Sequence, residues 1–251
     1  MSVRGDAPAA RGSREQRLRE FRYALRYLVS AYPVPYMAWA RRHYAGTGIR
    51  VLGRDTEVVI EGFGRSGSTF AVDAFESAQA RPIAIAHHTH AAAQVIEAAR
   101  RDLPTLVLVR EPMDAVLAHM VRRGIGPRPP LVAWIRYHRA ILPYRERVVL
   151  GRMSALSTDL DRMIRAVNER FGTAFAEFQP TKQNVSQVFE GIERRNRERY
   201  GGAAVSLARP SAEREAQKLL VAHQLEAPEL EPLRRRAREI YERLAPLPNG
   251  A

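Results

Sequence analysis

The chain has 251 residues, which is enough for one large α/β domain or two small ones with a substantial core. The absence of cysteine excludes disulfides and thiolate metal sites, and no apolar run approaches the ~18 residues that a membrane span needs. The formal net charge of +13 comes almost entirely from arginine, and it favours an anionic partner such as a nucleotide, a nucleic acid, an acidic glycan or an anionic membrane.

The first 48 residues are predicted to form a short tail and two helices. Residues 1–12 are small and polar with Pro and Gly, which predicts a disordered tail. A helical pattern starts at Ser13, with four apolar residues three or four positions apart among arginines: Leu18, Phe21, Leu25 and Leu28. An aromatic-rich helical or turn-rich stretch follows at 32–44. We expect these N-terminal helices (13–48) to pack against a sheet, and the basic first helix could also make peripheral contact with a membrane surface.

The chain before residue 41 shows no apolar run long enough for a signal peptide, so a cytoplasmic location is expected. Residues 57–171 then alternate short apolar runs with helical patterns, which is typical of a parallel βαβ sheet. The predicted strands are Glu57–Glu61, Pro82–Ala86, Thr105–Val109 and Val148–Leu150. The predicted helices are Ser68–Ala78, Ala91–Arg101, Met113–Arg122, Leu131–Leu142 and Thr158–Phe171, with the Pro-rich segment Gly124–Pro130 as a loop.

The remaining residues, 173–251, are predicted to be a helical C-terminal region rather than a second domain. Charged helices are indicated at Gln183–Tyr200, Pro210–Leu220 and Glu229–Leu244, with Gly201–Leu207 as a connection. The prediction is therefore a single domain over residues 13–251, with a three-layer α/β/α fold and a central parallel sheet of four to five strands.

A glycine-rich turn connects the first predicted strand to the helix that follows it. In such a strand–turn–helix context, backbone N–H groups can hold a phosphate, although an ordinary Gly/Ser turn is the plain alternative. Gly62, Gly67 and Thr69 match the nucleotide-binding P-loop, but Ser68 stands where that motif has the lysine that reaches the β- and γ-phosphates. The missing lysine argues against ATP or GTP turnover.

The other predicted strands end without the Asp that a Mg²⁺-dependent NTPase usually has there. The second is followed by His87, the third by Arg110 and the fourth by Gly151-Arg152, and the nearest acids are Glu111 and Asp114. The sequence therefore predicts a site for an anion without a metal.

Three histidines follow the second predicted strand: His87, His88 and His90. The carboxyl end of a strand in an open α/β sheet faces the ligand crevice, and histidine is the usual general base near neutral pH. On an extended segment His88 and His90 would share one side while His87 points away. A zinc site and a simple helix-capping role are the alternatives, although no acidic or cysteine ligand lies near in sequence.

The string GRSGSTF resembles the 5′-phosphosulfate loop of the PAPS-dependent sulfotransferases, especially carbohydrate-type and bacterial members. The resemblance implies a P-loop sulfotransferase fold that binds the donor 3′-phosphoadenosine 5′-phosphosulfate (PAPS). It also implies that the loop side chains and N–H groups hold the 5′-phosphosulfate and that Arg65 stabilises charge on the departing phosphate. The residues that would bind it are Arg65, Ser66, Gly67, Ser68 and Thr69.

Thr89-His90 is similar to the Thr-His pair of cytosolic sulfotransferases, which implies that His90 is the catalytic base. Some family members use a glutamate, so His88 and an acid remain open as alternatives. Arg110 looks like the arginine that binds the 3′-phosphate, a role that suits the bidentate guanidinium, unless it only pairs with a neighbouring acid. The family's second 3′-phosphate contact, a serine, is replaced by Ala118.

The string Arg209–Glu215 resembles one found in bacterial sulfotransferase-like proteins, near the loop that closes over the donor. Arg209 and Ser211 are therefore candidates for the 3′-phosphate end, although Ser211 could equally cap the next helix.

The expected reaction is transfer of a sulfuryl group from PAPS to a hydroxyl of a carbohydrate, lipid or small metabolite, without a metal. Two alternatives are a Mg²⁺-dependent P-loop kinase and a non-catalytic basic protein that binds nucleic acid. Nucleic acid is not the expected partner, because the aromatic residues cluster near the N-terminus and around Trp134–Tyr144 instead of alternating with basic residues.

Overall fold

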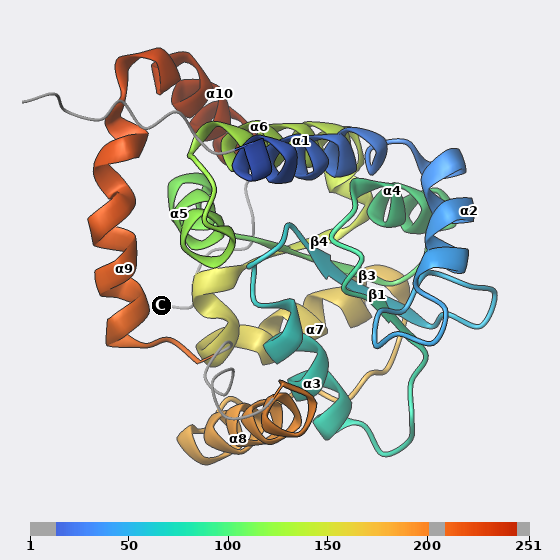
Figure 1. Ribbon diagram of the computed structural model, residues 1–251. Coiled ribbons are helices and arrows are strands. Elements are labelled where there is room, and N and C mark those ends of the chain that lie inside the picture. Colours follow the sequence, from blue (N-terminus) through green and yellow to red (C-terminus); the bar gives the residue numbers. More distant parts are fainter. Residues whose placement is uncertain (1–13, 201–208, 245–251) are drawn as a thin grey trace, which may run out of the picture.

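The computed structural model describes residues 14–200 and 209–244. The predicted tail at 1–12 and the predicted connection Gly201–Leu207 lie outside these ranges. The centre is an all-parallel sheet of four strands in the order β2-β1-β3-β4 (Figure 1). The strands are β1 (Val58–Gly62), β2 (Ile85–His87), β3 (Thr105–Val109) and β4 (Val149–Arg152). The predicted parallel α/β sheet is confirmed.

Helices cover both faces of the sheet in three layers (Figure 1). One face carries α3 (Ser68–Ala78), α7 (Leu156–Phe171) and α8 (Lys182–Tyr200). The other face carries α1 (Arg14–Val29), α4 (Ala92–Arg100), α5 (Pro112–Arg123), α6 (Arg128–Ile141) and α10 (Glu231–Leu244). At the sides, α2 (Pro33–His43) packs on α4 and α9 (Ala212–Ala222) packs on α5.

Successive strand residues pack on opposite faces of the sheet, which is why the strands are rich in apolar residues. Leu106 and Leu108 of β3 pack with α3 and α7, whereas Val107 and Val109 pack with α4, α5 and α6. Successive side chains of a strand point to opposite faces, so a strand covered on both faces needs apolar residues at every position. The same rule explains why β1 is buried along its whole length.

The strand register brings three chain segments to one edge of the sheet. In the parallel pairing, Ile60 lies beside His87 of β2 and Gly62 lies beside Leu108 of β3. The glycine-rich turn, the histidines after β2 and Arg110 after β3 therefore leave the sheet at the same carboxyl edge, where open α/β sheets bind ligands.

Two predicted boundaries are wrong. The second strand starts at Ile85 and includes His87, because Pro82 has no N–H for the ladder and Ala84 donates its N–H to the side chain of Glu57. The predicted loop Gly124–Pro130 is shorter, because α6 already begins at Arg128 with prolines in its first turn, where a missing N–H costs nothing.

The first helix packs on the core through residues that the sequence pattern did not identify. The residues that pack α1 on the core are Tyr23 and Tyr27. The apolar series that begins with Leu18 and Phe21 faces outward instead. No helix within the described residues is both long and apolar enough to cross a membrane.

Candidate functional site

The glycine-rich loop between β1 and α3 needs glycine at two positions. Gly67 is the N-cap of α3 with a left-handed φ of 82°, and a Cβ there would collide with Leu156. A Cβ on Gly62 would lie 2.6 Å from the carbonyl oxygen of Leu108. Among the described residues no side chain caps α3, so the N–H groups of its first turn keep their capacity to bind an anion.

The loop has a strained backbone position and a buried hydroxyl that lacks a hydrogen-bond partner among the described residues. Arg65 has a left-handed φ of 69°, which is costly for a residue with a Cβ. The Oγ of Ser66 is buried without a hydrogen-bond partner among the described residues, and Ser68 is buried at the start of α3. The Oγ1 of Thr69 lies 3.0 Å from Nε2 of His88. Such features are characteristic of segments that bind ligands.

His119 supports the loop from α5 and was not among the predicted site residues. Its Nε2 lies 2.9 Å from the carbonyl oxygen of Gly64, and its Nδ1 lies 3.2 Å from the hydroxyl of Tyr23. A carbonyl oxygen only accepts, so Nε2 carries the proton and Nδ1 accepts from the tyrosine. Burial lowers the pKa of His119 to about 3. One signal in the sequence could have pointed to His119: it directly follows Ala118, the position where sulfotransferases have a serine that contacts the 3′-phosphate.

Arg110 links the end of β3 to the glycine loop. Its Nη1 donates to the carbonyl oxygen of Arg65 at 2.7 Å, and its Nε donates to Oδ2 of Asp114 at 2.7 Å. The alternative prediction, an ion pair between Arg110 and a neighbouring acid, is therefore present, but the same guanidinium also contacts the loop. The residue is buried, which makes a hydrogen-bonded charge at this position structurally important.

Two cationic residues of α9 complete a basic cluster around Arg110. The Nζ of Lys218 donates to Oδ1 of Asp114 at 2.7 Å. Burial, followed by the positive charges of Arg214 and Arg110, lowers the pKa of Arg65 to about 10. Mutually repelling cations at one place are stabilised by a bound anion, and guanidinium groups bind phosphate and sulfate oxygens well. Sequence reasoning missed Arg214 and Lys218.

The two predicted C-terminal residues are already engaged with other groups. Arg209 donates to Glu193 at 2.9 Å and lies over the ring of Phe189. Ser211 is the N-cap of α9, and its Oγ accepts from the N–H of Arg214 at 3.4 Å and from its Nε at 3.1 Å. The capping alternative for Ser211 is thus present, and a direct role of either residue in donor binding stays a prediction.

A buried carboxylate holds the histidine segment against β1. Glu61 accepts hydrogen bonds from the N–H and Oγ1 of Thr89 at 2.8 and 2.7 Å. It also accepts from Nε2 of Gln94 at 2.9 Å and from the N–H of His90 at 3.2 Å. Burial raises the pKa of Glu61 to about 7, while these hydrogen bonds act in the opposite direction. Glu61, which the sequence analysis did not identify as a site residue, therefore fixes the position of the predicted base His90.

His90 is held in one tautomer. Its Nδ1 lies 2.9 Å from the carbonyl oxygen of Gly62, so Nδ1 carries the proton and Nε2 carries the lone pair. Burial lowers the pKa of His90 to about 3, which keeps the ring neutral near pH 7. The side chain is nevertheless 22% exposed. A neutral imidazole with an available Nε2 is the form that can accept a proton.

The three histidines do not alternate along an extended segment. His88 and His90 have left-handed φ values of 63° and 50°, so the alternation expected for a strand does not apply. Instead the ring of His88 lies between His87 and Thr69. Its Nδ1 is hydrogen-bonded to Nδ1 of His87, and its Nε2 is hydrogen-bonded to Oγ1 of Thr69. Burial lowers the pKa of both His87 and His88, to about 3 and about 4.

The acids considered as alternative bases have structural partners. Glu111 caps α5 by accepting from the N–H of Asp114 at 2.7 Å. Although burial acts to raise it, hydrogen bonds from Arg110 and Lys218 lower the pKa of Asp114. Within residues 14–200 and 209–244, no group of three or more His, Asp and Glu side chains is arranged to hold a metal ion.

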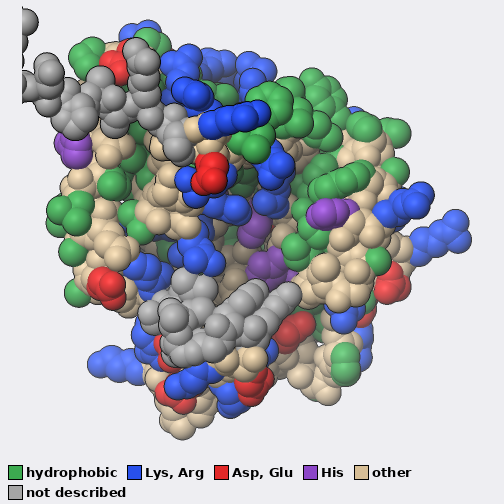
Figure 2. Space-filling model, in the orientation of Figure 1, with side chains coloured by type: hydrophobic (Ala, Val, Ile, Leu, Met, Phe, Trp, Pro, Cys, Tyr) green, Lys and Arg blue, Asp and Glu red, His purple; other side chains and the backbone are tan. Residues whose placement is uncertain are grey.

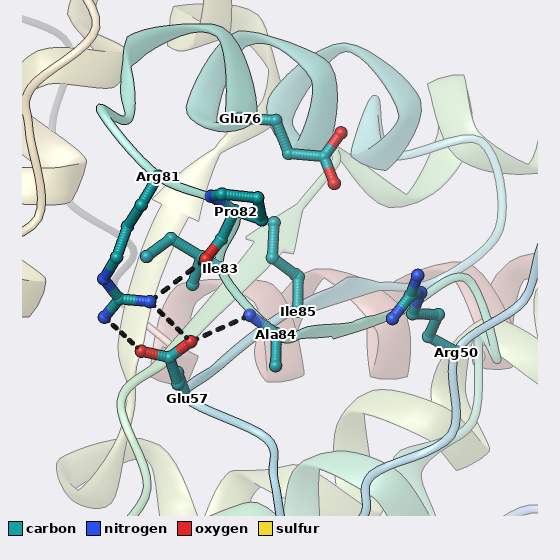
Figure 3. A pocket seen from close by; sticks show the side chains of 8 residues that line it. All are labelled: Arg50, Glu57, Glu76, Arg81, Pro82, Ile83, Ala84 and Ile85. Carbon is teal, nitrogen blue, oxygen red and sulfur yellow. Dashed lines mark hydrogen bonds and ion pairs between the residues drawn. The ribbon is translucent and has the colours of Figure 1, made fainter.

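The amino end of β2 carries a pocket of a different character (Figure 3). Its volume is about 390 Å³, and its wall includes the ion pair between Glu57 and Arg81 and the side chain of Arg50. Figure 3 shows the Glu57 carboxylate bonded both to Arg81 and to the N–H of Ala84. None of the predicted site residues lines this pocket.

At the carboxyl edge, Figure 2 shows histidine side chains in a recess near the centre of the face, with Lys and Arg side chains around them. The geometry is thus a glycine-rich loop, a basic cluster on one side and a neutral histidine on the other. No protein-family model matches the chain, and no curated protein or solved structure is significantly similar to it.

Proposed function

We propose that the protein is a sulfotransferase that binds PAPS along the carboxyl edge of the sheet and transfers its sulfuryl group to an acceptor hydroxyl. The observation that carries the proposal is the direct hydrogen bond between Arg110 and the backbone of Arg65. Two cations from different strand ends thereby meet beside a glycine loop in which Ser68 replaces the ATP-type lysine. This arrangement suits a donor with phosphate-like groups at both ends.

In this proposal the glycine loop and Arg65 bind the 5′-phosphosulfate, and Arg110 binds the 3′-phosphate. Arg214 and Lys218 of α9 support the 3′-phosphate end, since they lie next to Arg110 and Asp114. The basic cluster favours an anion. The positive charges of Arg214 and Arg110 lower the pKa of Arg65, and a bound negative charge would offset this repulsion.

The chemical step is an in-line displacement at sulfur. The acceptor oxygen forms a new bond to sulfur as the bond between sulfur and the bridging phosphate oxygen breaks. The acceptor proton passes to Nε2 of His90, and the displaced electron pair stays on the 5′-phosphate of adenosine 3′,5′-bisphosphate. Arg65 and the N–H groups of the loop stabilise that developing charge. Glu61 lies 3.9 Å from Nδ1 of His90 and would stabilise the imidazolium that forms.

A thermal-shift comparison of three ligands tests the proposal. Adenosine 3′,5′-bisphosphate is expected to raise the melting temperature, with or without EDTA. Mg²⁺-ATP and a short RNA are expected to raise it less, since ATP lacks a 3′-phosphate and the proposed site is built for a single nucleotide with phosphate-like groups at both ends. A larger shift with Mg²⁺-ATP would favour a P-loop kinase, and a larger shift with RNA would favour a nucleic-acid-binding protein.

A further inference from the structure

The first helix has two apolar faces, and the protein core covers one of them. Tyr23 and Tyr27 pack inward against the region of the glycine-rich loop. On the opposite side four large side chains are 41–63% exposed: Leu18, Phe21, Leu25 and Leu28. Their three- and four-residue spacing places them in one stripe along the helix. A continuous apolar stripe in water is unfavourable and marks an interaction surface.

Further exposed apolar side chains follow in the connection and in the next helix. The chain passes directly from α1 to α2 through residues 30–32, and Tyr32, Val34 and Trp39 are 59%, 81% and 45% exposed. Together, Leu18, Phe21, Leu25, Leu28, Tyr32, Val34 and Trp39 form what we name the outer N-terminal face. Figure 2 shows hydrophobic side chains gathered over the region of α1 and α2.

Arginines border this face. At 100° per residue, Arg17 and Arg22 fall on the two sides of the stripe formed by Phe21 and Leu25. Residues 14–44 contain seven arginines and only two glutamates, and one of these, Glu20, accepts from the N–H of Gly126 at 3.1 Å. The outer N-terminal face is therefore apolar along its centre and positively charged along its edges.

We propose that the outer N-terminal face docks on the surface of an anionic lipid bilayer. An apolar stripe enters the boundary between headgroups and acyl chains, and bordering arginines bind anionic headgroups. Tyr32 and Trp39 are the residue types that prefer that boundary. A second copy of the chain is a poorer occupant, because self-association would bring the two sets of arginines together. Docking is independent of the proposed function.

Docking would place the carboxyl edge of the sheet close to the lipid headgroups. The same helix that carries the stripe contacts the site on its inner side. Nη2 of Arg26 donates to the carbonyl oxygen of Thr89 at 3.2 Å, and Tyr23 bonds to His119 beneath the glycine loop. Figure 2 shows the recess with the histidines on the same face of the molecule as the apolar side chains over α1 and α2.

Vesicle binding by the full chain tests the proposal. We expect co-sedimentation with phosphatidylcholine vesicles that contain phosphatidylglycerol, and weaker binding to vesicles of phosphatidylcholine alone. The double variant Phe21→Ser/Leu25→Ser should bind at least ~10-fold more weakly, because two apolar side chains no longer leave water. The matched control is Leu219→Ser/Leu220→Ser, since these leucines of α9 are also 76% and 74% exposed but lie outside the face. It should bind like the parent.

Arginine variants and tryptophan fluorescence give independent readouts. Arg17→Gln and Arg22→Gln should each weaken binding to the anionic vesicles by about fivefold at low salt and by less at high salt. The chain has two tryptophans, and Trp134 is fully buried, so a blue shift of emission on vesicle addition would come from Trp39. Trp39→Phe should remove that shift.

Three results would overturn the proposal: no binding to the phosphatidylglycerol vesicles, equal weakening by both serine pairs, or a concentration-dependent dimer that only Phe21→Ser/Leu25→Ser abolishes. The last result would assign the face to a second copy of the chain. Adenosine 3′,5′-bisphosphate binding, measured in the same samples, should be unchanged in all these variants, so failure of docking and failure of the proposed function are distinguishable.

Discussion

The two sides of the carboxyl edge are built by different means. On the histidine side, the fully buried Glu61 joins β1 to Thr89, Gln94 and His90 through several short hydrogen bonds. On the arginine side, Arg214 and Arg110 lie close enough to Arg65 to lower its pKa, and Asp114 is shared between Arg110 and Lys218. The histidine side is a completed network that fixes positions, whereas the arginine side has an excess of positive charge that a ligand would offset.

This difference predicts that substitutions on the two sides fail in different ways. Changes on the histidine side should affect turnover or folding with little effect on donor affinity. Changes on the arginine side should affect donor affinity, with an additional cost in stability where the buried Arg110 is replaced.

The largest effect is expected for His90→Ala. Removal of a general base should reduce sulfuryl transfer by ~10²–10⁴-fold, with the affinity for adenosine 3′,5′-bisphosphate nearly unchanged. Steady-state rates with any accepted acceptor, together with titration of the bisphosphate, provide the measurement. His87→Ala and His88→Ala are the matched comparisons. If His90→Ala keeps more than roughly a third of the parent rate, far above the loss expected of a general base, the base is another residue.

The next effect is expected for Glu61→Ala, and it should appear in stability. The substitution leaves the buried donors of Thr89 and Gln94 without their acceptor, which should lower the free energy of unfolding by ~2–4 kcal/mol in urea titrations. Glu177→Ala is the control, because its ion pair with Arg165 lies at the surface and should matter little. Equal stability of the two variants would contradict a structural role for the buried network.

A smaller effect should accompany acidification. Burial lowers the pKa of His90 and His119 to about 3, below the ordinary value of 6.5 that applies in the unfolded chain. Between these values the unfolded state binds more protons, so stability present above pH 6.5 is lost as the pH falls toward 3. Glu61, with its raised pKa, acts in the opposite direction and offsets part of the loss.

Urea unfolding at pH 7 and pH 5 measures the balance. We expect the free energy of unfolding to be lower at pH 5 than at pH 7, since five buried or partly buried histidines contribute to the loss. Two carboxylates with raised pKa, Glu61 and Asp73, oppose it. Higher stability at pH 5 would show that the carboxylates dominate instead of the histidines.

Sequence reasoning predicted the sheet well because its signal is local. Most strand positions are apolar because both faces of the sheet are covered, and the glycine loop has a strand before it and a helix after it. The positions of Gly67 and Arg110 follow from that local pattern. The same reasoning expected the first helix to pack on the sheet but did not identify the face that does so, because periodicity shows that a helix has an apolar face but not which neighbour covers it.

The missed site residues depend on contacts between segments far apart in the chain. Lys218 joins the site because α9 packs on α5, which brings it to Asp114 across 104 positions. His119 supports the loop because its ring reaches Gly64 across 55 positions. No local pattern carries such pairings, so the prediction stopped at the neighbours Arg209 and Ser211, which resemble a family string but have other partners.

The most direct test of the donor site compares two ligands on Arg110→Ala. Adenosine 3′,5′-bisphosphate carries the 3′-phosphate and adenosine 5′-phosphosulfate lacks it. Loss of a charge-assisted contact should weaken bisphosphate binding by roughly ten- to a hundredfold, or ~1.5–3 kcal/mol, and leave adenosine 5′-phosphosulfate binding almost unchanged. Arg101→Ala, which removes a surface arginine paired with Glu97, should alter neither affinity. Equal weakening of both ligands by Arg110→Ala would contradict the proposal that Arg110 binds the 3′-phosphate.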